Sequence, residues 1–154
     1  MPADRLRALC GMIQYPIMLL GGPEDIEEGA FISHGDPHHI YNACGKFSLA
    51  ESADLVRRAK LVITHDTGLM HIAAAFRKPI ISIWGNTVPA FGMGAYYGKH
   101  RVPHQNFEVE GLKCRPCSKI GYKKCPRGHF NCMVLQPLHD IAKAVNQMIM
   151  HLEG

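Results

Sequence analysis

The sequence predicts an α/β fold in which helices cover both faces of a doubly wound, Rossmann-like parallel sheet. Short apolar runs alternate with helix-like stretches along most of the chain. The apolar runs are continuous rather than interrupted at every second residue, which is typical of parallel strands buried on both faces. Strand, helix and strand in strict succession indicate the doubly wound arrangement. A length of 154 residues fits one domain, 1–154, rather than two.

The individual elements follow from the apolar pattern. The predicted strands cover residues 16–20, 39–43, 61–64 and 79–84. The helix-like stretches between them cover residues 24–33, 48–59 and 66–76. Ser48 and Glu51 have the spacing of a capping box at the start of the second helix.

The last part of the chain consists of an irregular segment followed by a predicted helix. Residues 86–136 are rich in Gly, Pro, Tyr, His and Cys and show no regular period, so we expect irregular chain with a Cys-rich insert at 109–133. Residues 137–152 then predict a closing helix that packs on the domain through one apolar face, formed by Leu138, Ile141, Val145, Met148, Ile149 and Leu152.

Composition limits the class of protein. Hydrophobic residues make up 47% and charged residues 19% of the chain, as in a globular protein with a core. No apolar run approaches the roughly 20 residues of a membrane span, and the N-terminus has no apolar signal segment. We therefore expect a cytoplasmic protein, in which six cysteines do not indicate a disulfide framework. Cys10 and Cys44 are expected to be small buried hydrophobic side chains.

The other four cysteines form a cluster with metal-ligand spacing. Cys114, Cys117, Cys125 and Cys132 follow the pattern C-x2-C-x7-C-x6-C, which predicts a structural zinc or iron site of four thiolates. Six basic residues and no acidic one lie between Lys113 and Arg127, and we expect their charge to offset that of the thiolates. His129 is a candidate to replace one cysteine, and free thiols or two disulfides are the alternatives.

Three turns at predicted strand ends carry candidate binding groups. In the run HDTGLMH (65–71), a strand passes directly into a helix, so the N–H groups of Thr67, Gly68 and Leu69 face outward at the positive end of the helix. This geometry suits a diphosphate, while Asp66 suits sugar hydroxyls. The alternative is that Asp66 or Thr67 only caps the helix.

The second and third turns are 85–89 and 21–25. Ligands of open α/β sheets bind beyond the carboxyl ends of the strands, so we expect the turn at 85–89 to face the same crevice as Asp66. The third turn contains Gly22, Glu24 and Asp25, and can place a carboxylate against a ribose diol.

Taken in order, these turns resemble glycosyltransferase family 9, the ADP-heptose:lipopolysaccharide heptosyltransferases. The resemblance rests on LLGGPEDIEEG (19–29), a helix, and AKLVITHDTGLMHIAAAFRKPIISIWGNTVP (59–89). It implies the C-terminal, donor-binding half of a GT-B enzyme. Asp66 would contact the heptose, and Thr67, Gly68 and Leu69 the diphosphate. Thr87 would line the same pocket, and Glu24 or Asp25 would reach the ribose, with Gly22 in the same turn. His71, one turn into the helix, would match the family's histidine and support the site.

The resemblance also implies missing parts. The chain starts at the helix that follows the first strand of the family's donor domain, so that strand, its phosphate loop and a lysine would precede Met1. The N-terminal acceptor domain, which supplies the catalytic base, would be absent as well. Family members usually carry Pro where Asn86 stands, which makes the shape of that turn harder to transfer.

The functional prediction is therefore the ADP-heptose-like donor-binding part of an inverting heptosyltransferase of lipopolysaccharide core biosynthesis, inactive by itself. Its partners would be the nucleotide sugar and a lipopolysaccharide-type or other glycan acceptor, and not nucleic acid. Association with a membrane surface and homo-oligomers are left open. The alternatives are a metal-stabilised nucleic-acid-binding module and a non-catalytic remnant of a glycosyltransferase. His34, His38 and His39 are expected at the surface.

Overall fold

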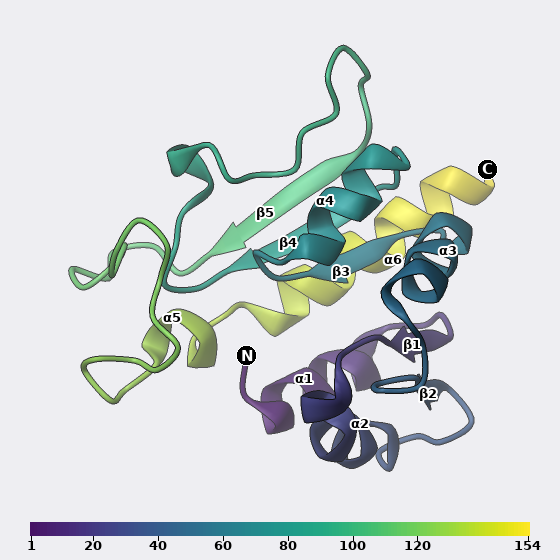
Figure 1. Cartoon of the computed structure of the whole chain (residues 1–154), viewed down its shortest axis with the longest axis horizontal. Coiled ribbons are helices and arrows are strands. Elements are labelled where there is room, and N and C mark those ends of the chain that lie inside the picture. The colour runs from purple at the N-terminus through teal and green to yellow at the C-terminus, as the bar shows by residue number, and fades with distance from the viewer. The chain divides into compact units, whose positions relative to one another are not determined.

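The computed structural model describes all 154 residues, and these divide into two compact units. The first unit comprises residues 1–58 and 138–154, and the second comprises residues 59–137. Figure 1 shows the path of the chain through both. Each unit contains helices and one sheet of parallel strands, which confirms the α/β class.

The first unit has a two-stranded parallel sheet surrounded by helices. Its elements are α1 (Ala3–Met12), β1 (Ile17–Leu19), the 3-10 turn η1 (Pro23–Asp25), α2 (Ile26–Ser33), β2 (Ile40–Asn42), α3 (Leu49–Arg58) and α6 (Leu138–Glu153). Strands β1 and β2 pair with Ile17 beside Ile40 and Leu19 beside Asn42. The two strands and α2 match the elements predicted for this part of the chain.

The core of the first unit forms where α1, α2 and the strands meet. Cys10, Ile32 and Ile40 are buried there, and Leu6 and Ile17 pack against them, as do Ala3 and Leu19. Cys44 is also buried, so both isolated cysteines are small core residues as predicted. Burial raises the pKa of the Cys10 thiol to about 11.

Helix α6 belongs to this unit and contacts α1. The Asn146 amide joins them, because it accepts a hydrogen bond from Gln14 N–H at 3.0 Å and donates one to the Met12 carbonyl at 3.2 Å. The buried residues of α6 are Leu138, Ile141, Ala142, Val145 and Ile149. Leu152, predicted on that face, is 47% exposed because it lies in the last turn of the helix.

The second unit has a three-stranded parallel sheet in the order β3-β4-β5. Its elements are β3 (Val62–Thr64), α4 (Gly68–Ala75), β4 (Ile80–Trp84), the 3-10 turn η2 (Pro89–Phe91), β5 (His104–Glu108) and α5 (Asn131–Val134). Every residue of β4 is buried, as expected for the central strand. Helix α4 packs on β3 and β4.

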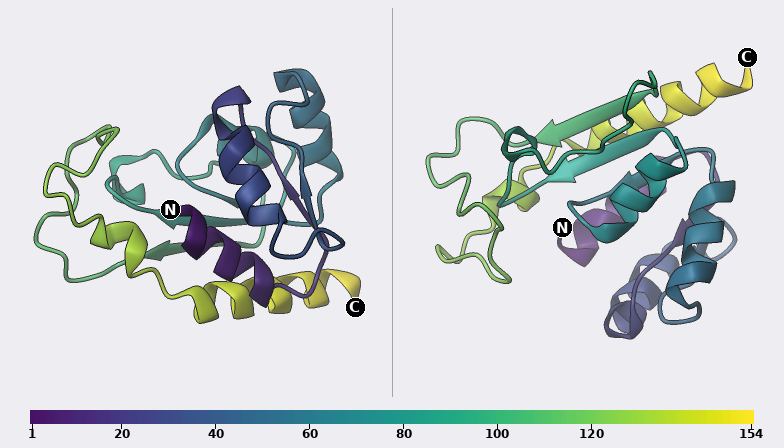
Figure 2. Two further views of the ribbon diagram at one scale, coloured as in Figure 1. Left: turned by 90° about the horizontal axis from the view of Figure 1, so that it is seen from below. Right: turned by 45° about the horizontal axis from the view of Figure 1, so that its top comes forward.

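Strand β5 corrects the expectation of an irregular chain over 86–136. It pairs in parallel with β4 along its whole length, from Ile80 beside His104 to Trp84 beside Glu108. Residues 109–130, in contrast, contain no helix or strand. Figure 2 shows this loop beyond the carboxyl ends of β4 and β5.

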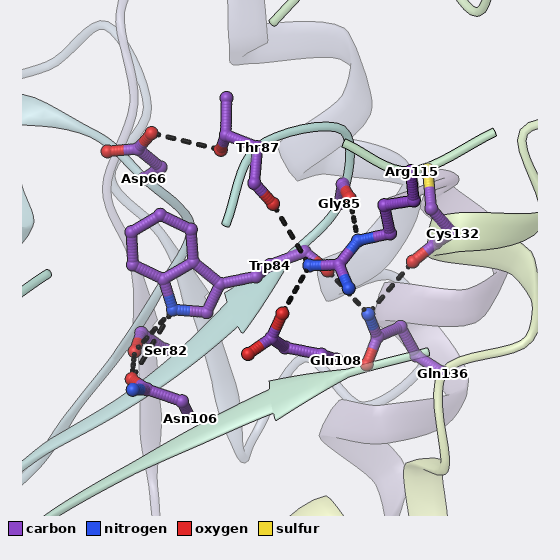
Figure 3. Close-up of polar contacts among 10 residues, drawn as sticks. All are labelled: Asp66, Ser82, Trp84, Gly85, Thr87, Asn106, Glu108, Arg115, Cys132 and Gln136. Carbon is purple, nitrogen blue, oxygen red and sulfur yellow. Dashed lines mark hydrogen bonds and ion pairs between the residues drawn. The ribbon is translucent and has the colours of Figure 1, made fainter. Parts of the chain in front are cut away.

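A polar network fixes β4 against its neighbours (Figure 3). The indole N–H of the fully buried Trp84 donates to Ser82 Oγ at 3.1 Å, and Ser82 Oγ donates to Asn106 Oδ1 on β5 at 2.5 Å. Gln136 Nε2 donates to the carbonyls of Trp84 and Cys132, both at 2.9 Å. These contacts hold the end of β4, from which the turn at 85–89 departs, in a defined position.

The strands pair as two parallel sheets, so a single doubly wound sheet and a single domain over 1–154 stay predictions. No helix has the length and the apolar character that crossing a membrane requires.

Candidate functional site

The turn between β3 and α4 carries three unpaired amide groups. Thr67 is the N-cap residue of α4, in an extended conformation, and no side chain caps the helix. The amide N–H groups of Thr67, Gly68 and Leu69 make no hydrogen bond. Thr67 Oγ1 instead lies 3.1 Å from Thr64 Oγ1. The helix-capping alternative for Asp66 and Thr67 is therefore wrong in this structure.

Space in front of this turn is open. A Cβ atom added at Gly68 would meet no other atom within 4 Å, and both Thr67 and Gly68 are exposed. A negative group that reaches this point would meet the unpaired N–H groups and the positive end of the helix together. The turn can therefore bind an anion such as a diphosphate.

The turn after β4 meets Asp66, as the sequence predicts. Thr87 Oγ1 donates a hydrogen bond to Asp66 Oδ2 at 3.1 Å (Figure 3). Thr87 is only 4% exposed, so its hydroxyl is fixed beside the carboxylate. The second oxygen of Asp66 has no hydrogen bond, which leaves an acceptor for a hydroxyl of a ligand.

A cavity of about 130 Å³ lies at these two turns. Its walls come from the turn after β3, from β4 and the turn that follows it, from the loop 109–130 and from α5. The lining residues are His65, Asp66, Ile83, Gly85, Asn86, Thr87, Ile120 and Met133. Burial lowers the pKa of His65 to about 4, so its ring is neutral at pH 7. The cavity is smaller than the roughly 300 Å³ of a small ligand pocket, so it fits part of a nucleotide sugar rather than the whole.

The remaining predicted donor residues lie elsewhere. His71 is exposed on α4 and forms no hydrogen bond, so the structure gives it no partner at the site. Gly22, Glu24 and Asp25 belong to the first unit. Asp25 Oδ2 accepts a hydrogen bond from Gly22 N–H at 2.9 Å, while Glu24 is exposed. Glu24 and Asp25 therefore both remain candidates for the predicted ribose contact.

The cysteine loop brings thiols close together without completing a metal site. Cys114, Cys117 and Cys125 line one cavity, of about 330 Å³. Cys114 Sγ lies 3.8 Å from His129 Nε2, and Cys125 Sγ accepts a hydrogen bond from Phe130 N–H at 3.4 Å. That N–H group lowers the pKa of Cys125.

The four predicted ligand cysteines form neither disulfides nor a group that could hold an ion. All six cysteines are free thiols, so the disulfide alternative is not formed in this structure. No three His, Cys, Asp or Glu side chains are arranged so that they could hold an ion. The predicted site at Cys114, Cys117, Cys125 and Cys132 would therefore require the thiols to draw closer together.

One residue of the loop has a role that the sequence did not indicate. Arg115 is expected to offset thiolate charge, but its side chain is 8% exposed and forms an ion pair with Glu108 at 2.7 Å. Its other hydrogen bonds go to the carbonyls of Gly85 and Thr87 (Figure 3). The carboxylate partner stands on the missed strand β5, so the pattern of charges in 113–127 could not identify it.

Comparison with known sequences places the chain in a family. Residues 2–122 match the family model described as glycosyltransferase family 9 (heptosyltransferase). Lipooligosaccharide heptosyltransferase 2 of Haemophilus influenzae is 37% identical over 81 residues, which are 50% of this chain and 23% of that protein. Lipopolysaccharide heptosyltransferase 1 of Escherichia coli K12 is 33% identical over 113 residues, 68% of this chain and 34% of that protein.

Solved structures agree on the fold. The glycosyl transferase family 9 protein of Veillonella parvula superposes with a TM-score of 0.72 at 22% identity, over 98% of this chain and 42% of that one. ADP-heptose lps heptosyltransferase II of E. coli gives a TM-score of 0.68 at 21% identity, over 99% and 41%. The chain thus spans less than half the length of these relatives. Because the family model covers most of its residues, the chain belongs to glycosyltransferase family 9, the heptosyltransferases.

Proposed function

We propose that this chain is the donor-binding part of an inverting heptosyltransferase of lipopolysaccharide core biosynthesis, and that its ligand is an ADP-heptose-like nucleotide sugar. The proposal rests on two kinds of binding group that lie together at the carboxyl end of β3. Three unpaired N–H groups lie at the positive end of α4, and Asp66 lies beside them with one oxygen held by Thr87. A diphosphate and a sugar hydroxyl, joined in one molecule, match these groups.

The proposed reaction is a displacement with inversion at the anomeric carbon. An acceptor hydroxyl attacks the anomeric carbon from the face opposite the diphosphate, the bond to the diphosphate breaks, and a base takes the hydroxyl proton. The N–H groups of Thr67, Gly68 and Leu69 and the dipole of α4 stabilise the negative charge on the leaving diphosphate. Asp66 orients the sugar, and the ribose contact of Glu24 or Asp25 stays a prediction from the resemblance.

The wider organisation belongs to the same proposal. By its resemblance to family 9 we assign the chain to the C-terminal half of a GT-B enzyme with one doubly wound sheet, and it covers less than half of each solved relative. We place the base and the lipopolysaccharide-type acceptor in the other half, and the reaction in the cytoplasm. Association with a membrane surface and with further copies of the chain stay predictions.

Calorimetry with two ligands tests the donor site. Asp66→Ala should weaken the binding of ADP-heptose about tenfold, because the sugar loses its hydrogen bonds to a carboxylate. The binding of ADP, which has no heptose, should weaken much less. Asp140→Ala, which removes an exposed carboxylate from α6, is the matched control and should leave both affinities unchanged. Equal losses for both ligands would reduce Asp66 to a structural role. No binding at millimolar ADP by the folded protein would refute the donor site.

We further propose that Cys114, Cys117, Cys125 and Cys132 hold a structural zinc or iron ion. Three of the thiols line one cavity, and the charges of Cys114, Cys117 and Cys125 all raise the pKa of Cys132, as burial does to a greater extent. Four protein ligands would leave no position for substrate, so the ion would only fasten the loop.

Elemental analysis tests the metal. Protein purified without chelator should contain about one zinc or iron per chain, as expected for a single four-ligand site. Cys117→Ser should lose the ion, whereas Cys44→Ala, which changes a buried thiol of the first unit, should retain it. Metal-free protein with an equally ordered loop would contradict this part of the proposal.

A further inference from the structure

The side chain of Arg115 binds the turn that carries Thr87. Its Nε donates to the carbonyl oxygen of Gly85, and its Nη2 donates to the carbonyl oxygen of Thr87 at 2.9 Å. The same Nη2 donates to Glu108 Oε2 at 2.7 Å. With 8% of its surface exposed, the side chain is enclosed by these three acceptors (Figure 3).

The backbone next to Arg115 completes the contact. Cys117 N–H donates to the carbonyl oxygen of Asn86 at 2.9 Å. Residues 115–117 therefore bind three successive carbonyls, those of Gly85, Asn86 and Thr87. Asn86 Nδ2 adds a hydrogen bond to the carbonyl of Tyr122 at 2.7 Å, so a second point of the loop holds the same turn.

This contact fixes the direction of the amide groups in the turn. The peptide bonds after residues 85, 86 and 87 are trans, so each N–H points away from the carbonyl of its own peptide group. The N–H groups of Asn86, Thr87 and Val88 therefore face away from Arg115 and Cys117, and they form no hydrogen bond. The Thr87 hydroxyl is held towards Asp66 by the same fixed backbone.

Arg115 is unsuited to bind a donor directly. Its charge is balanced by Glu108, and its enclosed side chain is turned to the protein's own carbonyls. A guanidinium suits this task because its planar fork reaches two carbonyls and a carboxylate at once, which a lysine ammonium on a flexible stem does not. Its influence on a donor would therefore pass through the turn.

We infer that Arg115 is a positioning residue for the donor site: it holds the 85–87 turn in the shape that presents Thr87 to Asp66 and the free amides to the ligand. The effect on ligand binding rests on the proposed function. The effect on the turn rests only on the contacts just described, so the two can be tested separately.

Three variants separate positioning from charge. Arg115→Lys keeps the charge without the fork, and Arg115→Met removes both. Lys119→Met removes an exposed charge from the same loop and is the matched control. NMR measures the amide shifts of Asn86, Thr87 and Val88 and the exchange protection of Cys117 N–H, while calorimetry measures ADP affinity at a temperature where every variant is folded.

The expected result is a change in both readouts. Arg115→Lys should shift the three amide signals, expose Cys117 N–H to exchange and weaken ADP binding about tenfold, as for the loss of a charged hydrogen bond. Lys119→Met should match the wild type. If Arg115→Lys leaves the turn signals and Cys117 protection unchanged, the inference is wrong. A lower melting temperature with unchanged ADP affinity overturns it too, because Arg115 would then only stabilise the fold.

A wild-type protein that binds no ADP would refute the proposed function. The NMR readout would still decide whether Arg115 holds the turn. A low yield of the Arg115→Lys variant would not affect the result, because NMR and calorimetry compare folded protein only.

Discussion

The hydroxyl of Thr87 is buried and donates its hydrogen bond to a carboxylate, so its removal has two separable effects. Thr87→Val keeps the volume of the side chain but leaves Asp66 without its partner, and we expect a loss of about 1–3 kcal/mol in the free energy of unfolding. Thr87→Ser retains the hydroxyl and is the control. Chemical denaturation measures both variants, and equal stability of Thr87→Val and wild type would contradict the role given to this contact.

At the scale of single residues, the position of a side chain is easier to predict from the sequence when it directly follows a strand than when it contacts a distant part of the chain. Asp66 and Thr87 each come soon after a buried strand, and parallel strands end at one edge, so their meeting could be predicted. Arg115 could not be assigned in this way. Its partners are backbone carbonyls of the 85–87 turn and a carboxylate on an unpredicted strand, and neither leaves a pattern in the sequence around it.

Among the elements, helix α3 offers a direct test of sequence-based reasoning. The predicted capping box is present: Ser48 N–H donates to Glu51 Oε2 at 2.8 Å, and Glu51 N–H donates to Ser48 Oγ at 3.3 Å. Ser48→Ala should lower the free energy of unfolding by about 1 kcal/mol. Ser52→Ala, one turn into the same helix, should not lower it, since alanine favours helix interiors. Equal effects of the two substitutions in thermal unfolding would show that the cap contributes nothing.

Four of the five strands were predicted because their sequences are mainly apolar, and the fifth was missed because its sequence is polar. Strands β1 to β4 are apolar runs, and β4 is buried along its entire length. Strand β5 has the sequence HQNFE, in which only Phe107 is buried. Its polar residues resemble a loop, so the pattern of hydrophobicity could not identify it. The contacts from Asn106 and Glu108 show that this edge strand nevertheless supports the site.

At the scale of the whole molecule, the candidate site in the second unit lacks a group suited to remove the proton from the acceptor hydroxyl. The titratable residues that line its cavity are His65 and Asp66. In the proposed complex the free oxygen of Asp66 accepts a hydrogen bond from the donor sugar, and burial lowers the pKa of His65 to about 4, which makes His65 a weak base at neutral pH. Among the loop histidines of the first unit, His34 and His38 are exposed as predicted, and His39 Nε2 contacts the carbonyl of Ile13 at 2.9 Å.

We therefore expect the 154-residue protein to bind the donor without transferring the sugar. Incubated with ADP-heptose and heptose-deficient lipooligosaccharide, it should release no ADP above the blank, while full-length lipopolysaccharide heptosyltransferase 1 of E. coli serves as the positive control. The lack of a base alone should prevent transfer, because the groups that stabilise a leaving diphosphate are present at α4. Acceptor-dependent release of ADP would show that a base is present after all. If His65→Gln then abolished that release, His65 would be the base, in spite of its low pKa. Release that survived the substitution would direct the search to the exposed histidines of the first unit.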